Sequence, residues 1–95
     1  MSERQADALH AVVRGRVQGV GFRFFVVECA QALGLSGWVR NRADGAVEVT
    51  AEGERADLDA LLVDLQQGPA GSQVEAVTHE WAAATDRFRE FRVVG

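Results

Sequence analysis

The sequence predicts an α+β fold in which two helices pack on one face of a mostly antiparallel sheet. Two segments carry apolar residues at helical spacing, and five short segments carry the apolar runs or the alternation typical of strands. These segments follow one another as strand, helix, hairpin, helix and strand, with one further strand at the C-terminus. Because 95 residues can bury only one modest core, we expect a single domain over 1–95.

The first strand and the first helix are predicted in the N-terminal third of the chain. A polar tail over 2–7 precedes a short apolar run from Leu9 to Val13, which predicts a strand over 9–17. The next apolar positions have helical spacing and form one stripe: Phe22, Phe25, Val26, Cys29, Ala30 and Leu33. Gly34 predicts the end of this helix. Since Cys29 belongs to the stripe, we interpret it as a core thiol rather than a nucleophile.

A hairpin, a second helix and two more strands are predicted in the remainder. Residues 35–41 and 46–52 form the hairpin around Asp44-Gly45, with Glu48 and Glu52 on its polar, solvated face. The second helix carries four leucines at helical spacing, Leu58, Leu61, Leu62 and Leu65. Asp57 and Asp59 lie near its start, and it ends at Gly68-Pro69. Strands over 74–82 and 88–94 complete the β-α-β-β-α-β order of a ferredoxin-like α/β sandwich plus a C-terminal strand.

Composition excludes several classes of function. The net charge of −4 provides no basic footprint for nucleic acid. The basic residues include arginines but no lysine, which excludes Schiff-base chemistry and the lysine of a Walker loop. A single cysteine rules out an internal disulfide and fits a reducing compartment, and no apolar run of about 18 residues predicts a membrane span. We therefore expect a cytoplasmic protein that binds neither nucleic acid nor membrane.

Residues 15–23, GRVQGVGFR, are unusually rich in glycine. A structural turn needs one or two glycines, so the three here suggest that something approaches the backbone closely. Because the segment joins the first strand to the first helical turn, its amides and the helix N–H groups converge on a place suited to an anion. Arg23 in that turn is opposed by the helix macrodipole unless an anion is bound, and its planar fork can hold two phosphate oxygens. The alternative is a tight turn beside a surface arginine.

Asn41 ends the second predicted strand, in the stretch WVRNRADG. It has the same parity as Val39, so both side chains should face the helices. In a right-handed β-α-β unit the first two strands are parallel, which brings Asn41 to the sheet edge that carries the glycine-rich loop. Its side-chain amide, beside an anion pocket, could hold a water at the phosphorus of a bound phosphate group. The alternative is that Asn41 helps form the turn with Asp44 and Gly45.

Two long stretches, GRVQGVGFRFFV and LGLSGWVRNRADGAVEVTAEG, resemble the acylphosphatase family, small enzymes that hydrolyse the carboxyl–phosphate bond of acyl phosphates. The resemblance covers about residues 9–53 by motif and the rest by element order, so the chain looks like one acylphosphatase-like domain. It implies that Arg23 binds the substrate phosphate and that Asn41 positions the attacking water. It also implies that backbone amides cradle the phosphate, those of Gln18, Gly19, Val20, Gly21 and Phe22.

The resemblance further implies metal-free hydrolysis without an organic cofactor, with an acyl phosphate as substrate and inorganic phosphate as product and competitive ligand. Separately, we expect a monomer. The departing carboxylate is a weak base with a pKa of about 4, so it needs no general acid. Phosphoryl transfer through a loose transition state depends mainly on positioning and charge stabilisation. His10 and His79 are interpreted as strand residues, since neither has a partner at metal-ligand spacing. The chain ends in FRVVG where family members often end in an aromatic residue, which leaves the leaving-group preference open.

Three other functions are compatible with parts of the pattern. The main alternative is a non-catalytic ferredoxin-like module that binds a phosphorylated or anionic metabolite. Single-stranded RNA binding needs stacking aromatics on the central strands, and the stretch AVEVTAE has none. Similar domains also occur at the start of larger carbamoyl-transfer proteins, although the short chain favours a free-standing enzyme. Trp38 and Trp81 are interpreted as sheet-packing residues rather than substrate contacts.

Overall fold

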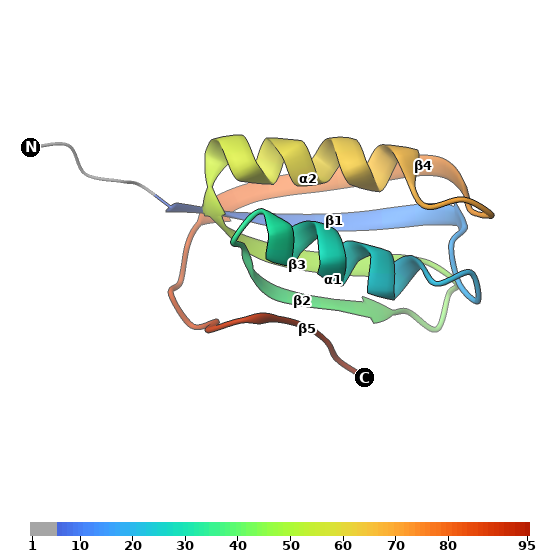
Figure 1. Cartoon of the computed structure of the whole chain (residues 1–95), viewed down its shortest axis with the longest axis horizontal. Helices are drawn as coiled ribbons and strands as arrows, with labels where there is room; N and C mark the ends of the chain where they lie inside the picture. The colour runs from blue at the N-terminus through green and yellow to red at the C-terminus, as the bar shows by residue number, and fades with distance from the viewer. Residues whose placement is uncertain (1–5) are drawn as a thin grey trace, which may run out of the picture.

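A computed structural model describes residues 6–95 as one five-stranded sheet with two helices on the same face (Figure 1). The elements in chain order are β1 (Ala6–Arg16), α1 (Phe22–Ala32), β2 (Ser36–Asn41), β3 (Val47–Glu54), α2 (Arg55–Gln67), β4 (Gln73–Ala83) and β5 (Phe91–Val93). The sheet order is β4-β1-β3-β2-β5, and only the pair β2 and β5 is parallel. The predicted ferredoxin-like class is therefore confirmed. Neither helix in this part of the chain is long and apolar enough to cross a membrane.

The boundaries differ from the expected ones at both ends of the chain. The polar tail predicted over 2–7 is wrong for Ala6 and Asp7, which already pair with β3, while residues 2–5 lie outside the described residues. The last strand is shorter than the predicted 88–94. Beyond it, the Val94 N–H still donates to the carbonyl oxygen of Val39 at 3.0 Å, so the C-terminus stays attached to β2.

The core lies between the helices and one face of the sheet. Alternate residues of the central strands are fully buried there, among them Leu9, Ala11, Val13, Val39, Val47 and Val49. They pack against the apolar stripe of α1 and the four leucines of α2, as the helical spacing predicts. Each buried leucine or phenylalanine contributes about 1.5–3 kcal/mol through the area it removes from water. This packing fixes both helices over the sheet.

The arrangement brings two connections to one end of the sheet. Since β1 and β2 both run antiparallel to β3, they are parallel to each other. Their carboxyl ends therefore lie at the same end, where the β1–α1 loop (residues 17–21) and the β2–β3 turn (residues 42–46) are found (Figure 1). The predicted placement of these two connections at one edge is confirmed.

Glu48 and Glu52 correct the expectation that the polar face of β3 is solvated. They are only 9% and 5% exposed, and both carboxylates are fully hydrogen-bonded. Glu52 accepts from the Thr85 N–H at 2.9 Å, the Thr85 hydroxyl at 2.7 Å and the Asp86 N–H at 3.0 Å. The alternation of β3 does direct both side chains to the open face of the sheet. The expectation of a solvated Glu52 failed because the β4–β5 connection folds back over this end of the open face and supplies the donors. Glu52 thus anchors the segment that leads to β5.

Replacing Glu52 with Gln should lower the free energy of unfolding by about 1–3 kcal/mol near neutral pH. The amide keeps one acceptor, but its NH₂ group opposes an N–H donor of the connection. Burial raises the Glu52 pKa, yet the hydrogen bonds from Thr85 and Asp86 outweigh it and hold the pKa below the ordinary 4.5. Because its pKa is lower in the folded protein than in the unfolded chain, the Glu52 carboxylate stabilises the fold above about pH 4.5. This stabilisation is lost as the pH falls through the lowered pKa.

Urea unfolding of both proteins measures this difference, which should be large at about pH 7 and shrink as the pH falls through the lowered Glu52 pKa. Glu28→Gln is the matched control, because Glu28 is exposed on α1 and the same change there should be nearly neutral. A difference between Glu52→Gln and wild type that stayed constant with pH would contradict the anchoring role of the charge.

Candidate active site

The β1–α1 loop owes its course to its glycines, which have different reasons to be there. Gly19 and Gly21 have φ of 76° and 77°, and a Cβ built on either would meet no atom within 4 Å. The backbone at these two positions is therefore open to an approaching ligand. At Gly15, by contrast, a Cβ would overlap the Gln73 carbonyl oxygen of β4, at an irregularity in the β1–β4 pairing. The interpretation that a close approach requires the glycines therefore holds at Gly15, where the approaching group is β4, and stays a prediction at Gly19 and Gly21.

Helix α1 begins at Phe22 with free N–H donors that no side chain among residues 6–95 caps. Gly21 is the N-cap in the left-handed conformation, and the first turn holds no acidic residue. The first helical hydrogen bond runs from the Phe25 N–H to the Gly21 carbonyl oxygen at 3.1 Å. The preceding N–H groups have no acceptor within the helix, so its positive end is left for an anion. Val20 and Phe22 pack against the core and hold the loop in place.

Arg23 stands in this first turn and is half-buried. Among residues 6–95 it takes part in no hydrogen bond or ion pair, whereas arginines in β1, β2, the β2–β3 turn and α2 each contact a carboxylate. A cation at a helix N-terminus is opposed by about 0.3–1 kcal/mol. Its placement is therefore unfavourable until an anion arrives, as the sequence predicted.

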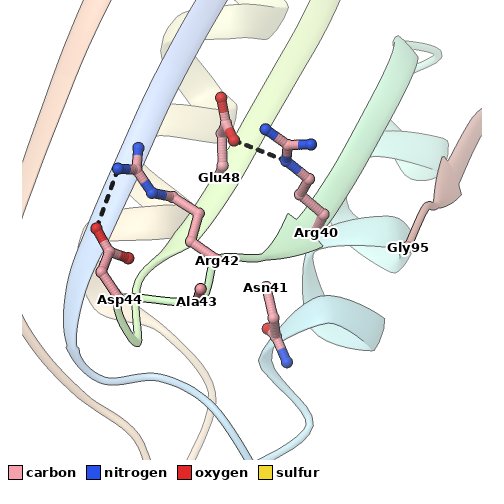
Figure 2. Close-up of a pocket in the computed structure, with 7 residues that line it drawn as sticks. All are labelled: Arg40, Asn41, Arg42, Ala43, Asp44, Glu48 and Gly95. Atoms are coloured by element: carbon pink, nitrogen blue, oxygen red, sulfur yellow. Dashed lines mark hydrogen bonds and ion pairs between the residues drawn. The ribbon is translucent and has the colours of Figure 1, made fainter.

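Asn41 is the last residue of β2. Val39, two residues earlier, is fully buried, and the side chain of Asn41 points away from Arg40 and Arg42 (Figure 2). Its Oδ1 atom is buried, and no donor in the described part of the chain reaches it. Leaving a buried acceptor without a partner costs about 1–3 kcal/mol. Such an orphan oxygen is a ready acceptor for a hydrogen bond from water.

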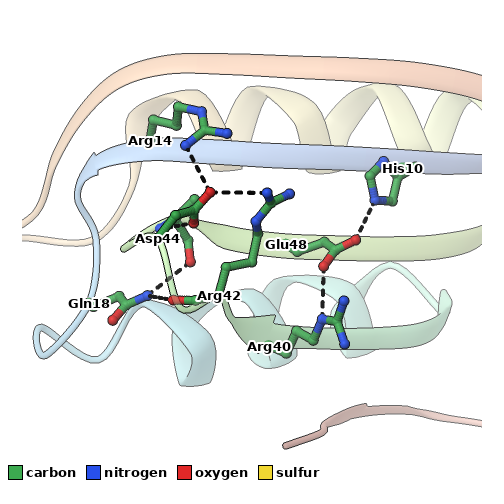
Figure 3. A network of polar contacts seen from close by, with 8 residues as sticks. His10, Arg14, Gln18, Arg40, Arg42, Asp44 and Glu48 are labelled. Carbon is green, nitrogen blue, oxygen red and sulfur yellow. Dashed lines mark hydrogen bonds and ion pairs between the residues drawn. The ribbon is translucent and has the colours of Figure 1, made fainter.

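The side chain of Gln18 joins the loop to the hairpin that carries Asn41. Its Nε2 group donates to the carbonyl oxygen of Arg42 at 2.8 Å and to that of Ala46 at 3.0 Å (Figure 3). The structure thus brings the loop beside the residue that follows Asn41. Sequence reasoning considered only the backbone amide of Gln18. No local signal could have revealed the side-chain contact, because it depends on how two separate connections meet.

The β2–β3 turn is braced from a second direction by Asp44 (Figure 3). One carboxylate oxygen accepts from the Ala46 N–H at 3.1 Å, and the other contacts Arg42 at 3.0 Å and Arg14 at 3.3 Å. The hydrogen bond from Ala46, followed by the two arginines, lowers the Asp44 pKa. The charged form of Asp44 is therefore the one that fits the turn.

A second polar cluster crosses three strands on the face of the sheet opposite the helices (Figure 3). Glu48 of β3 binds His10 of β1 at 2.7 Å and Arg40 of β2 at 2.8 Å, and Arg40 also lies over the ring of Trp38. Burial raises the Glu48 pKa, but the bonds from His10 and Arg40 outweigh it, and the net shift is downward. This cluster holds the strands that end at the candidate site.

A cavity of about 550 Å³ adjoins the hairpin (Figure 2). It is lined by Arg40, Asn41, Arg42, Ala43, Asp44, Glu48 and Gly95. It includes Asn41 but neither Arg23 nor the β1–α1 loop, so the two parts of the candidate site do not share this pocket. A phosphate held by backbone N–H groups needs only a shallow concavity.

The side chains that could supply other phosphatase chemistries are poorly suited to them. Burial, followed by the neighbouring Asp64, raises the pKa of the Cys29 thiol to about 11, so the interpretation of Cys29 as an inert thiol is supported. His10 is bound to Glu48, while His79 is exposed and packs edge-on against Trp81. No group of three or more potential metal ligands comes together among the residues described.

Comparison with known proteins shows the family to which this chain belongs. The acylphosphatase family model matches residues 9–93. An acylphosphatase of Koribacter versatilis is 55% identical over 84 residues, which cover 88% of this chain and 76% of that protein.

The solved structures agree. An acylphosphatase from Coxiella burnetii superposes with a TM-score of 0.91 at 38% identity, covering 99% of this chain and 100% of that one. The Bacillus subtilis acylphosphatase also gives a TM-score of 0.91, at 36% identity, covering 94% of this chain and 99% of that one. Sequence and structure therefore indicate the same family.

Proposed function

Because this chain belongs to the acylphosphatase family, we propose that it hydrolyses the carboxyl–phosphate bond of acyl phosphates to a carboxylate and inorganic phosphate. One observation of the structure supports the proposal in addition to the family. Within residues 6–95, Arg23 makes no hydrogen bond or ion pair and the Asn41 Oδ1 atom has no donor, and Gln18 links the two segments that carry them. The first can hold the anionic substrate and the second can hold the water that attacks it.

Arg23 and the loop amides bind the phosphate in this proposal. The planar guanidinium donates to two phosphate oxygens, and the backbone N–H groups from Gln18 to Phe22 donate to the others. The amide donors at the start of α1 are held in place before substrate arrives, because Gly21 is the helix N-cap and Phe22 is buried. Fixed donors stabilise the charge of the transition state without reorganisation.

Asn41 positions the nucleophile in this proposal. Its buried Oδ1 accepts a hydrogen bond from water and leaves a lone pair of that water directed at phosphorus. The water oxygen bonds to phosphorus while the bond from phosphorus to the carboxyl oxygen breaks, and the electron pair leaves with the carboxylate. The surplus water proton ends on a phosphate oxygen, so the products are a carboxylate and dihydrogen phosphate.

The chemistry requires no acid, base or metal in addition. The carboxylate leaves as a weak base with a pKa of about 4, and the loose transition state forms little bond to the nucleophile. All the proposed groups come from one chain, so we treat the enzyme as a monomer that needs no cofactor. Its net charge of −4 disfavours nucleic acid, and the single cysteine fits our proposal of a cytoplasmic location.

Turnover of benzoyl phosphate in the presence of a chelator tests this function. We expect release of benzoate and phosphate at a rate that the chelator does not change, and competitive inhibition by inorganic phosphate. Simple alkyl phosphate monoesters should be poor substrates, because their alkoxide leaving group is strongly basic and no general acid is positioned to protonate it.

Three outcomes would contradict parts of the proposal. Loss of turnover with the chelator would contradict the metal-free mechanism. Rapid hydrolysis of an alkyl monoester would show that the site supplies a general acid. Phosphate binding without any hydrolysis of benzoyl phosphate would favour the alternative, a module that binds an anionic metabolite.

A further inference from the structure

The side-chain amide of Gln18 makes a bridge that the proposed phosphate cradle does not use. A single nitrogen, Nε2, donates to two carbonyl oxygens, those of Arg42 and Ala46, at 2.8 and 3.0 Å (Figure 3). Both of its hydrogens are thus engaged, and both acceptors lie at the base of the β2–β3 turn. Among residues 6–95, these are the only side-chain hydrogen bonds between the β1–α1 loop and that turn.

The turn itself does not need Gln18 to close. The carbonyl oxygen of Ala46 already accepts from the Arg42 N–H at 2.8 Å, and that of Arg42 accepts from the Gly45 N–H at 3.1 Å. Asp44 braces the turn further through Ala46, Arg42 and Arg14. The hydrogen bonds from Gln18 are therefore not needed to close the β2–β3 turn. They link this turn to the β1–α1 loop. Each such neutral bond contributes only about 0.5–1.5 kcal/mol to stability.

We propose that Gln18 is a positioning residue whose side chain sets the distance between the phosphate cradle and Asn41. The inference rests on the proposed function, in which the loop holds the phosphate and Asn41 holds the water. The backbone of Gln18 is part of the loop, and its side-chain amide donates to the carbonyl oxygen of Arg42, the residue next to Asn41. Without this link no side-chain hydrogen bond among residues 6–95 joins the loop to that turn, so the spacing between the loop and the end of β2 is less tightly set.

The expected signature is a split between binding and turnover. Gln18→Met keeps the length of the side chain and the backbone amide but removes both hydrogen bonds. We expect kcat to fall about tenfold, because a small displacement of water from the phosphorus slows attack strongly. The Kd for inorganic phosphate, measured by calorimetry, should stay within about twofold of wild type.

A double-mutant cycle with Asn41→Ala tests whether Gln18 acts through Asn41. With Asn41 already removed there is no positioned water to misplace, so Gln18→Met should cause no further loss of kcat. Gln66→Met is the matched control, because Gln66 is exposed on α2 and its amide takes no part in the site. If Gln18→Met does not fold, Gln18→Asn carries the same prediction, since its amide is one methylene too short to bridge both carbonyls.

Three results would overturn the positioning role alone: an unchanged kcat in Gln18→Met, an equal loss of kcat with and without Asn41, or a loss of phosphate affinity as large as the loss of kcat. The last would mean that the side chain only maintains the shape of the cradle. Near-normal turnover of Asn41→Ala by itself would overturn the proposed role of Asn41 and this inference with it. The two failures are therefore distinguishable.

Discussion

Replacing Arg23 with Gln should abolish phosphate binding and turnover together. The guanidinium is the only proposed side-chain cation at the open end of α1, and a bidentate contact with two phosphate oxygens is lost with it. We expect kcat/KM for benzoyl phosphate to fall about 10³-fold and the affinity for inorganic phosphate to fall about 100-fold. Steady-state kinetics and calorimetry measure the two effects.

The same substitution should not weaken the fold. Arg23 makes no hydrogen bond or ion pair within residues 6–95, and it opposes the helix dipole. Removing its charge should therefore leave the free energy of unfolding unchanged or raise it by about 0.3–1 kcal/mol, as urea denaturation can show. A loss of activity without a loss of stability then excludes unfolding as the cause.

Two further variants separate charge from geometry. Arg89→Gln removes one positive charge from an exposed position near the other end of the sheet, and it should leave both constants nearly unchanged. Arg23→Lys retains the charge but not the planar fork, so it should recover only part of the phosphate affinity. Substantial turnover by Arg23→Gln would mean that the loop amides alone hold the substrate.

The fold was predictable because it depends on patterns that a single strand or helix carries. The stripe from Phe22 to Leu33 and the four leucines of α2 predicted the two helices, and the structure buries those faces. Parity with Val39 predicted the inward direction of Asn41, and β-α-β handedness predicted that its strand ends beside the glycine-rich loop. These steps need only local periodicity and one topological rule.

Features that depend on contacts between distant segments were not predictable in the same way. Glu48 and Glu52 alternate as solvated residues should, yet His10, Arg40 and the β4–β5 connection enclose them. The side chain of Gln18 reaches across to a different connection. Such contacts depend on strand register and loop course, which emerge only when the whole sheet has formed.

Asn41→Ala is expected to fold and to bind phosphate but barely to turn over. Without Oδ1 the attacking water loses its acceptor, and kcat should fall about 10²- to 10³-fold, the scale of losing one fixed catalytic hydrogen bond. Phosphate affinity should change little, since Arg23 and the loop amides remain. Pre-steady-state and steady-state assays with benzoyl phosphate, together with phosphate calorimetry, measure this difference.

Stability provides an independent check on the same residue. Because Oδ1 is buried without a partner among residues 6–95, removing it relieves a cost of about 1–3 kcal/mol, which offsets the packing lost with the side chain. Asn41→Ala should therefore be about as stable as wild type, a trade of stability against function that is common at active sites. Gln66→Ala, which removes an exposed amide from α2, should affect neither property. Near-normal kcat in Asn41→Ala would remove the water-positioning role, whereas a large loss of stability would show that a partner satisfies Oδ1 inside the fold.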